Sequence, residues 1–119
     1  MDDQNTQQNY SQILEEFSEE RPNIVACAVI KDGSVESCIF PSSFEKDTLA
    51  LIIDSTMKVG KSSLDKLGGK NLKRLLLKNE QGIIVLQQLN DSILFVLADQ
   101  KTKPGSLLLS VQELATKMT

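Results

Sequence analysis

The sequence predicts a single α/β domain of the layered α+β kind, with its elements in the order αββαβββα. Short apolar runs with strand character are separated by turn residues, and amphipathic stretches stand near the start, in the middle and at the end of the chain. No repeat or long linker divides the 119 residues, a length that suits one domain. Because 40% of the residues are apolar and only 4% are aromatic, we expect a core of Leu, Ile and Val.

The first helix is predicted at about residues 9–20. Three apolar side chains fall on one face of this helix: Ile13, Leu14 and Phe17. Pro22 follows and ends it. Residues 1–8 are rich in Asp, Asn and Gln, so we expect a flexible N-terminal segment there, followed by a domain that spans residues 9–119.

A β-hairpin is predicted next. Ile24–Ile30 reads as a strand, Asp32 and Gly33 form a tight turn, and Val35–Phe40 is the returning strand. Apolar residues occupy both alternating sets of the first strand, so both faces of the sheet should be covered.

The two cysteines lie on the two strands of this hairpin. A two-residue turn places Cys27 opposite Cys38. We therefore expect the thiols to face each other as a hydrogen-bonded pair, with Cα atoms about 5.5 Å apart. Buried, reduced thiols with a structural role are favoured over a redox switch.

A second helix is predicted at about residues 43–60, with Ser42 as N-cap and Glu45 completing a capping box. Its apolar stripe covers about half of the circumference, which is wider than a helix that rests only on a sheet requires. We infer that the helix also packs beside another helix, for which a second copy of the chain is the simplest candidate. The stripe consists of Leu49, Ile52, Ile53, Thr56, Met57 and Gly60, widened by Ala50 and Val59.

Leu51 projects from the other side of this helix. Its neighbours there are charged: Asp47, Asp54 and Lys58. Two interpretations stay open, an ordinary exposed leucine and the apolar anchor of a partner surface.

Three strands and a helix complete the predicted fold. The strands are expected at 72–78, 82–87 and 93–98, with a break at Gly68 and Gly69 before the first of them. The final helix has an apolar stripe formed by Leu107, Leu108, Val111, Leu114, Ala115 and Met118.

No catalytic or cofactor motif is found in the sequence. It has no His and only two Cys, so the commonest general base and the usual zinc ligand sets are missing. Gly60-Lys61-Ser62 matches the end of a phosphate-binding loop, but Ser55 replaces the first glycine of that motif and the segment ends a predicted helix. We interpret Gly60 as a helix terminator or a close-packing site. The sequence predicts no enzyme activity, no cofactor and no metal.

Charge is unevenly distributed along the chain. The net charge is −3, but residues 1–20 carry six acidic residues and no basic one, while residues 58–78 carry six Lys and one Arg against one Asp, or +6. These are either solvated faces or surfaces for charged partners. The acidic balance and the lack of aromatic residues among the lysines argue against nucleic-acid binding. No apolar run is long enough to span a bilayer, so we expect a cytoplasmic protein without direct membrane insertion.

Several segments, in this order and spacing, resemble the roadblock/dynein-light-chain family, in particular its prokaryotic regulators of Ras-like small GTPases. The matching segments are residues 13–17, 29–33, 67–72, 82–86, 91–97 and 104–108. The resemblance implies a roadblock/profilin-like fold: a five-stranded antiparallel sheet with the second helix on one face and the terminal helices on the other. Profilin-like and longin domains share this layering and remain alternatives for the fold.

The resemblance also implies a homodimer made by the second helices and third strands of two copies. The residues then expected at the dimer interface are Leu49, Ala50, Ile53, Met57, Leu72, Arg74 and Leu76. The residues expected to contact another partner are Leu51, Asp54, Ser55 and Lys58.

The function implied is that of a non-catalytic homodimeric scaffold or regulator of a small Ras-like GTPase. A GTPase-activating role would proceed without an arginine finger, because neither Arg21 nor Arg74 stands in a suitable context. The alternative is a structural light chain or assembly adaptor that binds a peptide or a sister roadblock domain independently of nucleotide. An enzyme or small-molecule sensor is the third and least favoured class.

Overall fold

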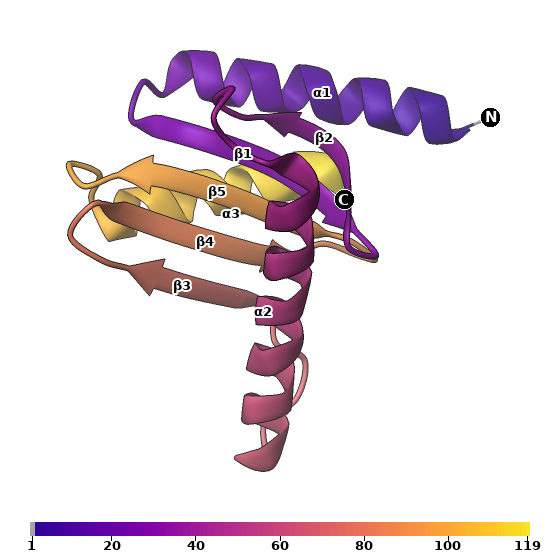
Figure 1. The fold of residues 1–119 in the computed structure, drawn as a ribbon, viewed down its shortest axis with the longest axis vertical. Coiled ribbons are helices and arrows are strands. Elements are labelled where there is room, and N and C mark those ends of the chain that lie inside the picture. Colours follow the sequence, from indigo (N-terminus) through magenta and orange to yellow (C-terminus); the bar gives the residue numbers. More distant parts are fainter. Residues whose placement is uncertain (1) are drawn as a thin grey trace.

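The computed structural model describes the backbone of residues 2–119 and the side chains of residues 10–119. The eight elements follow the predicted order (Figure 1). They are α1 (Asp2–Glu20), β1 (Ile24–Lys31), β2 (Ser34–Ile39), α2 (Lys46–Lys66), β3 (Arg74–Lys78), β4 (Gly82–Gln88), β5 (Ile93–Asp99) and α3 (Pro104–Met118). The strands form one antiparallel sheet in the order β2-β1-β5-β4-β3, which confirms the implied five-stranded sheet.

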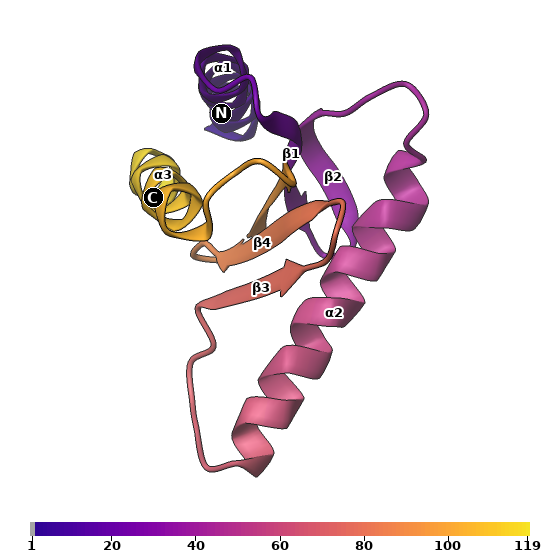
Figure 2. The ribbon, with the colours of Figure 1, turned by 90° about the vertical axis from the view of Figure 1, so that its left-hand side faces the viewer.

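The helices cover both faces of the sheet, as the resemblance implied (Figure 2). On one face α1 and α3 pack side by side, and their buried residues include Leu14, Phe17, Val111 and Leu114. On the other face α2 places Ala50, Ile53 and Met57 against the sheet. β1 contributes alternate residues to the two cores, which explains its continuous apolar run. Among residues 2–119 no helix has the length and apolarity needed to cross a membrane.

The ends of two helices differ from the prediction. α1 begins at Asp2 instead of near residue 9. The proposed flexibility of residues 1–8 concerns motion and stays a prediction. The capping box at Ser42 is wrong: α2 begins at Lys46, with Glu45 as N-cap and without a side-chain cap bond. The reason is a turn in which the Phe44 N–H donates to the Pro41 carbonyl at 3.0 Å and keeps residues 41–44 outside the helix.

Gly60 does not end α2, which continues to Lys66. A Cβ atom at Gly60 would lie 2.8 Å from Leu75 Cδ1 and 2.9 Å from Leu72 Cδ2, so the glycine allows a close approach of β3 and the segment before it. The close-packing interpretation of Gly60 is therefore the correct one. The helix ends where Gly68 takes up a positive φ of 85° and its N–H bonds to the Asp65 carbonyl at 3.0 Å.

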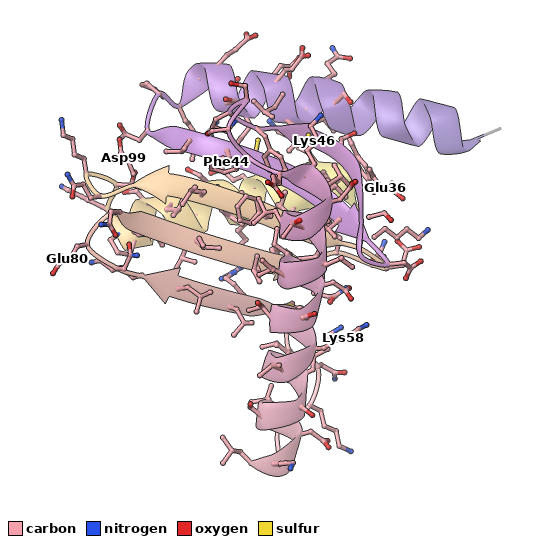
Figure 3. The ribbon with its side chains drawn as sticks, in the orientation of Figure 1. Glu36, Phe44, Lys46, Lys58, Glu80 and Asp99 are labelled. Atoms are coloured by element: carbon pink, nitrogen blue, oxygen red, sulfur yellow. The ribbon has the colours of Figure 1, made fainter. Side chains whose placement is uncertain are left out.

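The predicted pairing of the two cysteines is wrong. Cys27 lies opposite Ile39, and Cys38 lies opposite Ala28. The register shifts because Glu36, on the outer strand β2, is an extra residue that has no partner on β1 (Figure 3). One extra residue moves every side chain beyond it to the other face. Cys27 is therefore buried beneath α1 and α3, while Cys38 lies on the α2 face.

Candidate interaction surface

Helix α2 is longer than the sheet that it crosses. Its 21 residues span about 31 Å, whereas five strands spaced about 4.8 Å apart span about 19 Å between the outermost strands. α2 runs across the strands, starts above β2 and continues well past β3 (Figures 1 and 2). The C-terminal part of the helix therefore projects beyond the sheet of its own chain.

β3 is the edge strand next to this overhang. It pairs with β4 alone, in a register without a bulge from Arg74↔Gln87 to Lys78↔Ile83. Leu76 and Leu77 are exposed, at 38% and 46%. A regular apolar edge of this kind offers unpaired backbone groups to another strand, and natural proteins usually cover or interrupt such an edge. The opposite edge strand, β2, is interrupted by its bulge.

The α2 face of the sheet is covered only in part. α2 lies over one end of the strands and leaves the other end open (Figure 1). A hollow of about 330 Å³ lies at this open end. Its apolar lining comes from one residue on each of β1, β3, β4 and β5, in this order Val25, Leu77, Ile84 and Leu97. An apolar band across four strands needs a cover if the chain is to avoid aggregation.

The outer surface of α2 is also apolar at several positions. Leu51, Ile52 and Val59 are 60%, 55% and 65% exposed and line a shallow hollow of about 390 Å³ together with Ser55 and Thr56. The sequence placed Ile52 in the buried stripe, but the helix rotates it out of the core. Of the two residues that widened the predicted stripe, Ala50 is buried and Val59 is exposed; packing of the stripe beside a second helix stays a prediction.

The seven residues predicted for the dimer interface fall into two groups. Ala50, Ile53 and Met57 are at most 3% exposed because they hold α2 on the sheet. Leu76 lies exposed on the β3 edge, Leu72 and Arg74 are half-buried just before and at the start of β3, and Leu49 is half-buried in the first turn of α2. The Arg74 Nε donates to the Gln87 Oε1 at 2.7 Å across β3 and β4. Among the seven, the members that a second chain can reach most readily are those on or near β3.

The four residues predicted to contact a further partner lie together on α2. Lys58 points away from the open half of the sheet (Figure 3) and forms an ion pair with Asp54 at 2.9 Å. At 100° per residue Leu51 lies within about 20° of Lys58 around the helix, whereas Ile52 lies about 120° away. Leu51 also approaches the β1–β2 turn, since a Cβ at Gly33 would be 3.2 Å from Leu51 Cδ2. Ser55 is exposed between the two sides.

Solved structures show the same arrangement of elements. Myxococcus xanthus MglB superposes with a TM-score of 0.86 at 12% sequence identity, over 95% of this chain and 86% of that one. A roadblock/LC7 domain from Streptomyces avermitilis superposes with a TM-score of 0.80 at 16% identity, over 89% of this chain and 91% of that one. The fold is that of a roadblock/LC7 domain.

The structure also resembles profilin, whose fold was one of the alternatives that the sequence left open. Schizosaccharomyces pombe profilin matches this roadblock fold with a TM-score of 0.68 at 14% identity, over 90% of this chain and 94% of that one. No protein-family model matches the sequence, and no curated protein matches it. At these identities the likeness establishes the roadblock fold and nothing finer.

The interior of the domain is a packed core. The Cys27 thiol points to the Leu14 carbonyl oxygen at 4.0 Å, and both cysteines are free thiols. Burial raises the pKa of Cys27 to about 12, and the neighbouring Cys38 adds to the rise. Among the described residues no group of three or more His, Cys, Asp and Glu side chains is placed to hold a metal ion.

Sequence reasoning missed the apolar band on the open half of the sheet. Val25 is the extra residue at a second register shift, between Ile24 and Ala26 on β1, which turns its side chain to the α2 face. Leu97 and Ile84 were predicted simply as strand residues. The apolar character of both sets of β1 residues indicated that both faces are covered, but it did not indicate that the chain covers one of them only in part.

Proposed function

We propose that this chain is a non-catalytic, homodimeric roadblock scaffold in the cytoplasm that binds a small Ras-like GTPase. The observation that carries the dimer is the combination of an open, regular β3 edge with an α2 that overhangs this edge. Pairing two β3 strands around a twofold axis would satisfy both edges. The overhanging part of each α2 would then lie on the partner's side of the β3 edge.

The exposed apolar groups fit this arrangement. The exposed apolar residues of α2, Ile52 and Val59, lie on the same side of the molecule as the apolar band on the open half of the sheet, to which Leu77 of β3 belongs. A partner helix placed beside α2 would bury them together, and an assembly of this kind typically buries at least about 1,200 Å² in total. A structure described as MglB with a tetrameric arrangement has the same fold, with a TM-score of 0.84 at 18% identity.

The GTPase partner rests on the resemblance to the roadblock family, whose members hold or regulate Ras-like GTPases. The Leu51 side of α2 supports this role because Leu51 lies about 100° around the helix from Ile52, toward the charged side chains of Asp54 and Lys58, and would stay accessible beside a second copy. It offers an exposed leucine beside an ion pair of Asp54 and Lys58, which is the usual composition of a modest protein interface. Any stimulation of GTP hydrolysis would arise by repositioning residues of the GTPase itself.

Two measurements test the proposal. Sedimentation equilibrium of the wild-type chain should give a dimer at micromolar concentration, and a monomer there would overturn the dimer. A pulldown with the Ras-like GTPases of the same organism, loaded with GTP or GDP, should retain one of them in a nucleotide-dependent way. Stable complexes that are indifferent to nucleotide would support the structural light chain or adaptor instead.

A further inference from the structure

A groove lies on the other side of the overhang, and most of its lining residues belong to neither of the proposed interfaces; the exceptions are Lys58, Leu72 and Arg74. It lies between the C-terminal half of α2, the segment 67–73 and the end of α3, and has a volume of about 1220 Å³. The segment 67–73 runs back alongside the C-terminal half of α2 (Figure 2), and residues of both line the groove. The start of β3, the end of β4, the β4–β5 turn and the C-terminal half of α3 contribute the rest.

The charges that line this groove are almost all positive. The only acidic side chain in the lining is Asp65. The basic side chains in the lining are Lys58, Lys61, Lys70, Lys73 and Arg74. Within residues 10–119, Lys61, Lys70 and Lys73 have no carboxylate within ion-pair distance, in contrast to Lys58. The chain has 16 acidic residues in total, so the groove is basic because nearly all of these residues lie outside it. Unpaired cations around a hollow attract an anionic ligand.

The remaining lining favours a polypeptide over other anions. Amide and hydroxyl side chains predominate between the lysines, including Asn71, Gln112 and Thr116, and these can bond to a peptide backbone. The lining contains no aromatic residue on which nucleic-acid bases would stack.

We propose that this groove binds an acidic segment of a partner protein, held between the end of α2 and the end of α3. The segment would carry several Asp or Glu residues facing Lys61, Lys70 and Lys73. Because exposed ion pairs are individually weak and are screened by salt, the interaction should depend on several charges together and should weaken as ionic strength rises. The residues that this binding requires, Lys61, Lys70 and Lys73, belong neither to the proposed GTPase surface nor to the predicted dimer interface.

The test uses a fluorescein-labelled peptide of alternating Glu and Ala residues and a control peptide with Gln in place of Glu. The informative variant is the full-length chain with both Lys70→Glu and Lys73→Glu. The matched control has Lys101→Glu and Lys103→Glu, which changes the net charge equally in the loop before α3. That loop lies at the opposite end of α3 from the groove, about 22 Å along the helix.

Fluorescence anisotropy should show that the Glu peptide binds the wild type and the Lys101 and Lys103 variant equally, and binds the Lys70 and Lys73 variant at least about tenfold more weakly. The Gln peptide should not bind. All four lysines are exposed, and equal thermal unfolding by circular dichroism will show that both variants are folded. A Glu peptide with a photo-crosslinker should label residues 58–74 or the end of α3.

Three results would overturn the proposal. The first is equal weakening in the two double variants, which would reveal a response to net charge alone. The second is crosslinking outside the groove. The third is a preference for single-stranded DNA or for phosphatidylserine vesicles over the Glu peptide in competition.

Discussion

Replacing Ile52 by Asp is expected to convert the proposed dimer into folded monomers. Ile52 is 55% exposed on α2, and its neighbour Leu51 is 60% exposed on a different side of the same helix. The two positions therefore form a matched pair, with the same substitution, similar exposure and the same local helix. Ile52 points toward the open half of the sheet, where the proposal places a second copy, whereas Leu51 lies about 100° further around the helix, toward Lys58.

The magnitude follows from the exposed fraction. Complete burial of an isoleucine contributes about 1.5–3 kcal/mol, so the exposed half of Ile52 leaves about 1 kcal/mol to be gained in a dimer. Twofold symmetry doubles this to about 2 kcal/mol, which corresponds to about thirtyfold in Kd. Burying two carboxylates adds at least about 1 kcal/mol each, so the total weakening should reach at least several hundredfold, on the order of 4 kcal/mol.

Sedimentation equilibrium over a concentration series measures this change directly. The Ile52→Asp chain should sediment as a monomer at concentrations where the wild type is a dimer, with unchanged circular dichroism. Leu51→Asp should remain dimeric. The reasoning is refuted if Ile52→Asp dimerises as tightly as the wild type, or if both variants dissociate to the same extent.

The other predictions concern the Leu51 surface, the cysteines and Gly60. Leu51→Asp should weaken binding of the cognate GTPase by more than about 1 kcal/mol in calorimetric titration without changing thermal stability, and equal affinities would remove this surface from consideration. A thiol reagent should modify Cys38 in the folded chain and Cys27 only on unfolding, because Cys27 is fully buried. Since the pKa of Cys27 rises from 9.0 to about 12 on folding, its contribution to stability is complete below pH 9 and is lost as the pH rises toward 12. Urea unfolding at pH 10 should therefore show a loss on the order of 1 kcal/mol that a Cys27→Ala variant lacks, and identical pH profiles would contradict this. Gly60→Val should destabilise the chain by about 1–3 kcal/mol in urea unfolding, because its side chain would overlap Leu72 and Leu75, and unchanged stability would show that β3 can move away.

Local patterns in the sequence account for most of the fold. Period-two apolar runs and turn residues such as Asp32-Gly33 predicted the strands, and the helical stripes predicted α2 and α3. Helix ends were less predictable, because competing local bonds decide them. The turn that Pro41 and Phe44 close displaced the start of α2, although the capping-box residues are present.

The candidate surface was predictable in outline but not residue by residue. The width of the α2 stripe indicated that the helix has more apolar surface than one sheet needs. Which side of the stripe is exposed depends on how the helix is rotated over β1 and β5, and this rotation places Ala50 inside and Ile52 outside. Packing between segments that are distant in the sequence sets this rotation, and the helical periodicity of one segment carries no information about such packing.

What the sequence alone determined is the order of the elements, the aliphatic core and the separation of acidic and basic segments, since these follow from residue type and local period. Tertiary structure alone decided that Cys27 and Cys38 lie on opposite faces, because one unpaired residue at Glu36 changes the register of the whole strand. Tertiary structure also decided that α2 is longer than the width of the sheet, since this width depends on the number of strands that the helix crosses. The basic groove follows from that difference in length, whereas the open β3 edge follows from the order of the strands and the uncovered apolar band from the position of α2 over one end of them.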